Sequence, residues 1–319
     1  MRFGTVVTAV STAEPYGTAA LWLTGLDRGL VLAGLALALG GLAGRGLARQ
    51  YKGERPGPLP TPWAVRGSLL GLLASAALLV TALAGPGLAA ELARPPVPGL
   101  RSGGTAEIAA IELVLFALAA VTARLRRAGL AALMLTGVII AEGIRSHPEG
   151  IVPVAGALLT YCHVAPALLW AGLLCYALRC AAAWRHNPAA ARGIIRLYAT
   201  AAAWLFAVVL VTGVISALVL VPLGSFLTTA YGLFLIAKAA VVAVAAGLAL
   251  AGRRKLGRES VPGAGPALVT RFELVALGAV LAITGMLTVL TPPAKPITAA
   301  SSPAAQPAIA RSGASGQAG

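Results

Sequence analysis

Long apolar segments alternate with short polar connections along the chain. Each apolar segment is about 20 residues long or longer, which is enough to cross a hydrocarbon core about 30 Å thick as an α-helix. The predicted helices cover residues 28–48, 66–90, 106–124, 128–146, 152–180, 194–221, 229–251 and 270–290. The pattern therefore predicts an all-α fold, a polytopic membrane protein built as a bundle of eight transmembrane helices.

Proline-rich segments explain several of the breaks between these helices. The stretches PGPLPTP (residues 56–62), RPPVPG (residues 94–99) and VPGAGP (residues 261–266) cannot continue a helix, because proline lacks an amide hydrogen and clashes with the preceding turn. Residues 1–27 show no secretory signal pattern and are expected to stay as an N-terminal segment. The transmembrane domain is predicted over residues 28–291, followed by a disordered tail at 292–319 that is rich in Pro, Ala, Ser and Gly.

Composition and charge support a membrane location. Hydrophobic residues form 58% of the chain, charged residues only 11%, and the mean hydropathy of +0.86 excludes an ordinary soluble domain. The net charge of +15 comes from short basic clusters between apolar segments, so no nucleic-acid binding is predicted. Most Lys and Arg residues lie in alternate connections. By the positive-inside rule, both termini are expected outside the cytoplasm.

A histidine lies inside the fifth predicted helix. The segment ALLTYCHVAPALLWAGLLCYAL (residues 157–178) carries His163, one of only three histidines in 319 residues. An ionisable group at membrane depth is costly and marks either a hydrogen-bonded pair or a functional site. Pro166 leaves the carbonyl of Cys162 without its helical donor, and Trp170 follows on about the same face beyond small alanines. The residues alone leave two alternatives for His163, a hydrogen bond to a neighbouring helix or a metal contact.

Other polar residues fall at a similar depth in the outer half of the bundle. The predicted intramembrane polar network contains Glu112, Glu142, Lys238, Tyr231 and Trp170, with His147 at its mouth. Alternatively, Glu142 and His147 simply line the outer interface, and Tyr231 is an ordinary interfacial tyrosine without a special role. For Glu112 and Lys238, matched depth and opposite charge predict an ion pair between the third and seventh helices.

Three segments give the chain a resemblance to a known family. They are HVAPALLWAGLL (residues 163–174), YGLFLIAK (residues 231–238) and FELVALGAVLAITGMLTVLTPP (residues 272–293), with SHPEG after the fourth helix. Over about residues 110–293 the sequence resembles the bacterial copper-resistance protein D family, while the first two helices agree only in number and polarity. The resemblance implies copper handling at the inner membrane, import in particular, near an extracytoplasmic copper-carrier protein. It also implies copper contact at His163 and His147.

The ligand chemistry fits this expectation in part. Imidazole binds copper, and thioether or thiol sulfur favours Cu(I), so Met286 and Cys162 are further candidate ligands for a copper ion. The chain has only three methionines and lacks methionine-rich stripes, and Met286 has core packing as its alternative.

Two other kinds of function stay open from the sequence. One is a haem-binding or redox membrane protein, and the other is a non-transporting membrane partner of a periplasmic copper carrier. No segment resembles a nucleotide-binding loop, a hydrolase triad or a soluble catalytic domain, so neither ATP-driven pumping nor an enzyme is predicted.

Overall fold

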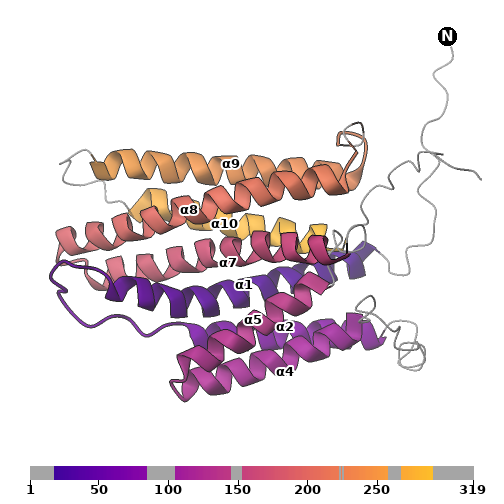
Figure 1. Ribbon diagram of the computed structural model, residues 1–319, viewed down its shortest axis with the longest axis horizontal. Helices are drawn as coiled ribbons and strands as arrows, with labels where there is room; N and C mark the ends of the chain where they lie inside the picture. The colour runs from indigo at the N-terminus through magenta and orange to yellow at the C-terminus, as the bar shows by residue number, and fades with distance from the viewer. Residues whose placement is uncertain are drawn as a thin grey trace, which may run out of the picture.

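Eight helices and no strand occur in the part of the chain that the computed structural model describes, which is residues 18–84, 105–144, 153–222, 224, 226–257 and 267–289. The helices are α1 (Thr18–Arg49), α2 (Ala64–Ala84), α4 (Thr105–Arg124), α5 (Ala128–Ile144), α7 (Pro153–Ala183), α8 (Pro188–Leu220), α9 (Ala230–Gly257) and α10 (Ala267–Leu287) (Figure 1).

Six of the described helices are long and apolar enough to cross a membrane by length and composition. The other two, α5 and the Leu274–Leu287 part of α10, are shorter apolar helices. The all-helical, multi-pass membrane fold is therefore confirmed. A count of eight membrane crossings stays a prediction, as does the placement of the termini. The tail at residues 292–319 and most of the 1–27 segment lie outside the described residues.

The first helix begins ten residues earlier than the apolar pattern predicts. Asp27 and Arg28 lie inside α1, and both side chains are buried. Arg28 donates a hydrogen bond from Nη1 to the backbone carbonyl of Thr288 at 2.8 Å, just beyond the end of α10. A carbonyl at a helix C-terminus lacks an intrahelical donor. The buried guanidinium of Arg28 supplies one here, so the bond satisfies both groups.

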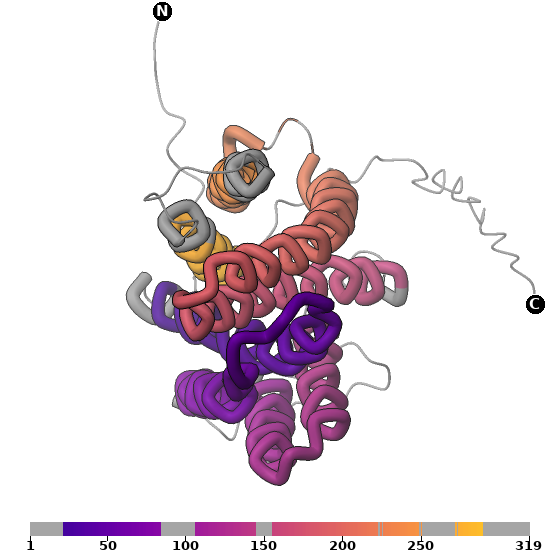
Figure 2. Tube along the Cα trace, turned by 90° about the vertical axis from the view of Figure 1, so that its left-hand side faces the viewer, coloured from indigo at the N-terminus to yellow at the C-terminus, as the bar shows by residue number. Residues whose placement is uncertain are grey.

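Helix α1 is the centre of the bundle. It packs against α2 on one side and against α7 and α10 on the other. Helices α4 and α5 continue beyond α2, while α8 and α9 lie at the opposite edge of the molecule (Figures 1 and 2). The bundle thus has an α2–α4–α5 side and an α7–α10 side, joined mainly through α1 and also by contact between α5 and α7.

Glycines bring the backbone of α1 close to its neighbours. A Cβ atom added at Gly34 would lie 2.6 Å from the amide nitrogen of Gly71 in α2, and one added at Gly40 would overlap the backbone of Gly172 in α7. Towards α10, a Cβ atom at Gly29 would lie 3.5 Å from Cα of Ala282. Small residues of this kind allow close helix packing in membranes, where association depends on van der Waals contact rather than on exclusion of water.

The connection between α1 and α2 folds back onto the end of α7. The Tyr176 hydroxyl donates to the carbonyl of Pro60 at 2.8 Å, and Arg179 Nη1 donates to the carbonyl of Thr61 at 2.7 Å. The proline-rich segment thus breaks the helix, as predicted, and is also fixed against the bundle. This contact lies at the end of the bundle that the charge distribution predicts to be cytoplasmic.

Candidate functional site

His163 lies in the N-terminal half of α7, where α7 packs against α8. Its half-buried ring has Nδ1 3.1 Å from the Thr212 hydroxyl oxygen of α8. The next residue, Gly213, leaves room for the ring, because a Cβ atom there would lie 3.0 Å from His163 Cε1. On α8, Gly213 therefore gives the imidazole of His163 space, and the adjacent Thr212 gives it a polar partner.

The Thr212 hydroxyl determines which ring nitrogen of His163 carries the proton. Its single hydrogen donates to the backbone carbonyl of Val208 at 2.6 Å, so it accepts rather than donates at Nδ1. In the 3.1 Å hydrogen bond, Nδ1–H is then the donor and the threonine oxygen is the acceptor. Neutral imidazole in this tautomer has its lone pair on Nε2. Nε2 is thus the nitrogen able to bind a metal ion or accept a proton.

Lys238 of α9 is the charged neighbour of this histidine. Its ammonium group interacts electrostatically with His163, and its side chain is half-buried. The sequences of α7, α8 and α9 contain no Asp or Glu, so these three helices supply no carboxylate to neutralise the lysine. The site therefore combines one neutral ligand atom with one positive charge.

The predicted ion pair between Glu112 and Lys238 is wrong. Glu112 is fully buried on α4, which packs between α2 and α5, whereas Lys238 lies on α9 beside α10 and α8. These two helices are at opposite edges of the bundle in both views (Figures 1 and 2). Matched depth in the membrane gave no information on which helices are neighbours, and the central α1 separates the two sides.

The remaining acidic residue of the predicted network is also on the α4–α5 side. Glu142 is half-buried on α5, near the contact in which the Tyr161 hydroxyl of α7 donates to the Ile140 carbonyl at 3.0 Å. The predicted single network is therefore divided: Glu112 lies on α4, at the opposite edge of the bundle from Lys238 on α9, whereas Glu142 lies on α5, which contacts α7, the helix of His163.

The two predicted aromatic members have packing contacts. Trp170 is buried on α7 with its ring edge against Phe206 of α8, at a centroid distance of 5.3 Å and an interplanar angle of 68°. Its indole Nε1 has no hydrogen-bond partner among the described residues. Tyr231 is buried at the start of α9 in a small cluster with Leu220, Val221 and Leu287.

The predicted sulfur ligands lie apart from one another. Met286 is buried where α10 crosses α1, with its sulfur over Gly25, so its contacts are those of core packing. Cys162 is exposed on α7. His147 lies outside the described residues. Within the described residues, no group of three or more His, Cys, Asp or Glu side chains is arranged to hold a metal ion.

Thr212 and Gly213 are the site residues that the sequence interpretation missed. The signal was present in VTGV (residues 211–214), a polar and a small residue adjacent in the middle of a long apolar segment. Threonines in such positions often bond across helices. The spacing alone did not indicate which helix would supply the partner.

The fold defines a multi-pass helical membrane protein. Residues 192–289, from within α8 to just beyond α10, match the family model described as copper resistance protein D, which confirms the resemblance over this segment. The match covers about a third of the chain and includes Thr212, Gly213 and Lys238, whereas His163 precedes it. No curated protein and no solved structure matches the chain.

Proposed function

We propose that this protein moves copper ions across the bacterial cytoplasmic membrane and that His163 binds the ion through Nε2 during passage. One observation carries the proposal: the hydrogen bond from Nδ1 to Thr212, which leaves the Nε2 lone pair as the ligand. Histidines that bind metal ions commonly donate their other ring N–H to an acceptor, which fixes the tautomer and the ring orientation. Imidazole is also a suitable ligand for copper.

The small number of ligands is consistent with a transient binding site. A transported ion must bind well enough to enter and weakly enough to leave. In this proposal His163 is the innermost ligand and His147 the first contact at the outer mouth, with Cys162 and Met286 as further sulfur donors along the path. The ammonium of Lys238 repels a bound cation and shortens its stay at His163. An extracytoplasmic copper-carrier protein is the proposed source of the ion.

Copper binding by the purified protein tests the site. His163→Ala should abolish most binding, because it removes the ligand atom while a small residue fits the α7–α8 contact. His186→Ala is the matched control, since this exposed histidine lies in the connection between α7 and α8. Size-exclusion profiles and thermal unfolding would show that both variants are folded. Wild-type stoichiometry and affinity in folded His163→Ala would show that the histidine is only a structural hydrogen-bonding group.

Two further measurements test transport and orientation. Proteoliposomes containing this chain alone should take up copper, whereas a non-transporting partner of a copper carrier would show none. A reporter fused after Gly319 should be active only if it works outside the cytoplasm, as the charge distribution predicts. Activity of a reporter that works only in the cytoplasm would reverse the orientation, and with it the proposed direction of entry.

A further inference from the structure

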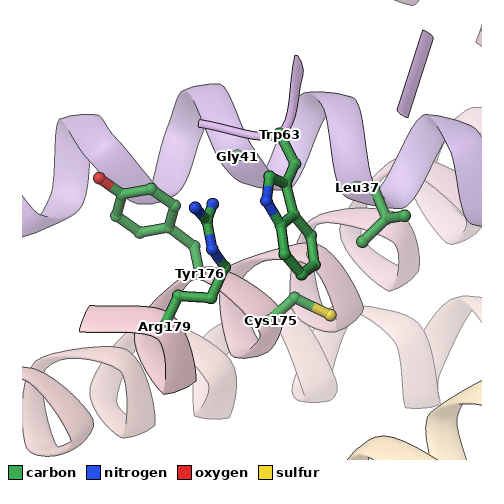
Figure 3. A pocket seen from close by; sticks show the side chains of 7 residues that line it. Leu37, Gly41, Trp63, Cys175, Tyr176 and Arg179 are labelled. Carbon is green, nitrogen blue, oxygen red and sulfur yellow. The ribbon is translucent and has the colours of Figure 1, made fainter. Parts of the chain in front are cut away.

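A small pocket between α1 and α7 lies at the opposite end of the bundle from His163. It is lined by Leu37, Gly41, Trp63, Gly172, Cys175, Tyr176 and Arg179 (Figure 3). Its two parts differ in chemistry. Leu37, Cys175 and the two glycines form an apolar wall, while the Arg179 guanidinium lies between the rings of Tyr176 and Trp63.

Three arginines gather around this pocket. The Arg179 guanidinium carbon is 4.3 Å from the centroid of the Trp63 ring, and that of Arg66 is 5.9 Å from the same ring. Arg45 of α1 is near enough to interact electrostatically with Tyr176. Its Nε is buried and has no hydrogen-bond partner among the described residues.

These arginines lack an acidic partner. No ion pair links Arg45, Arg66 or Arg179 to a carboxylate in the part of the chain that the structure describes, and Glu54 in the nearby connection is exposed. Arg66 and Arg179 also repel each other. Like charges held together in this way favour a bound anion, which would neutralise them and accept their remaining N–H groups.

We propose that the three arginines at this pocket bind the phosphate of an anionic phospholipid. The position supports a lipid: Trp63, which is only partly buried, is at the end of the bundle predicted to face the cytoplasmic leaflet, where tryptophan lies at the headgroup level. Basic pockets between helices on that side bind acidic headgroups. The site is separate from the copper site and does not depend on the proposed transport function.

Lipid binding measured on the full chain in detergent tests this proposal. Phosphatidylglycerol and phosphatidylcholine would be titrated, with bound lipid counted by native mass spectrometry and thermal unfolding as a second readout. The double variant Arg45→Gln with Arg66→Gln removes two charges and leaves the Arg179 bond to Thr61 intact. It should bind phosphatidylglycerol about 30-fold more weakly, since each basic side chain near an acidic headgroup contributes about 1 kcal/mol.

Arg124→Gln with Arg127→Gln is the matched control, because these exposed arginines make the same charge change at the α4–α5 turn. Its phosphatidylglycerol affinity should equal that of the wild type. Arg45→Lys with Arg66→Lys keeps the charge and should retain most of the binding. Equal losses in the two glutamine double variants would show a general surface-charge effect and overturn the site. Equal binding of phosphatidylcholine would also overturn it, as would displacement of the lipid by inorganic phosphate, which would identify a free-anion site.

Discussion

Helix α1 and helices α8 and α9 represent two different ways of packing in one bundle. Half of the spanning part of α1 is buried, and its contacts bring backbone against backbone at glycines. In α8 only 11% of the spanning part is buried, and in α9 17%. Large apolar side chains such as Trp204, Val211 and Leu218 of α8 are exposed to lipid. The candidate copper site lies in the second region, at the contact between α7 and α8 and beside α9.

This difference distinguishes a closely packed scaffold around α1 from two helices that bury less of their surface. Protein elements that move in function are drawn from regions with few buried contacts. The glycine contacts of α1 hold α7 in place, so His163 is attached to the scaffold. Its partner Thr212 and its charged neighbour Lys238 are on the less buried helices. A shift of α8 or α9 would therefore change the surroundings of the histidine while leaving the histidine itself in position.

The largest expected effect is on the scaffold. Gly40→Leu would place a side chain into the backbone of Gly172, where neither helix can yield without moving the other. We expect destabilisation of about 3 kcal/mol or more and loss of most folded protein, measured as monodisperse yield and thermal unfolding. Gly46→Leu on the same helix is the control, because nothing lies within 4 Å of that position. Equal yields of the two variants would contradict the central role of α1.

The hydrogen bond between α7 and α8 is expected to give the next largest effect. Thr212→Val keeps the shape of the side chain but removes the acceptor for Nδ1–H, so the imidazole loses its fixed tautomer. Changes of this kind typically weaken metal binding about 10- to 100-fold, and we expect a loss in this range. Thr212→Ser should restore affinity. Thr200→Val is the control, since the Thr200 hydroxyl bonds only within α8, to the Arg196 carbonyl. Unchanged copper affinity in Thr212→Val would show that the hydrogen bond does not support a ligand.

A smaller effect of opposite sign is expected on α9. Lys238→Met removes the positive charge near His163 but keeps a long side chain, so copper should bind more tightly, by less than about tenfold because solvent and nearby dipoles screen the charge. The same variant should release copper more slowly in proteoliposomes, which lowers turnover. Lys52→Met, in the exposed α1–α2 connection, controls for the change in net charge. Weaker binding by Lys238→Met would indicate that the lysine helps to hold the ion instead.

The smallest expected effect is the coupling free energy between Glu112 and Lys238, which should be near zero. Glu112→Gln and Lys238→Met alter residues on helices at opposite edges, so their effects on the free energy of unfolding should add to within about 0.5 kcal/mol. A double-mutant cycle by thermal or denaturant unfolding measures this. A larger coupling would mean that α1 transmits strain between the sides.

The length of the apolar segments predicted all eight helices that the structure describes, because lipid requires the backbone hydrogen bonds of a spanning segment to be satisfied within it. It misplaced the start of α1, because Asp27 and Arg28 interrupt the apolar pattern and their burial depends on contacts made elsewhere, such as Arg28 with Thr288. His163 was found because an ionisable residue is conspicuous in an apolar helix. Thr212 was not, since a threonine is common in such a segment and its role depends on which helix lies opposite.

The sequence did not show which helices pack against one another. Depth is readable from the distance along a helix, but the order of helices around α1 is set by shape. The glycines that decide this order, among them Gly40 and Gly172, look alike in the sequence whether they face a helix or lipid. The three arginines around the pocket were predicted only as charges in alternate connections, and their gathering there follows from the folded α1–α2 connection.

The central position of α1 also has a consequence for biogenesis. Because α1 is synthesised before α2, α7 and α10, it covers its glycines towards α2 early, but its contacts with α7 and α10 need segments that end at residues 183 and 287. At 5 to 20 residues per second, the last of these partners is completed roughly 10 to 50 s after α1 itself. During that interval, the side of α1 that later contacts α7 and α10 faces lipid or the insertion machinery. The same helix carries Asp27 and Arg28, which are buried in the complete bundle. Synthesis therefore encloses the two sides of α1 at different times, the α2 side early and the α10 side only when α10 is complete.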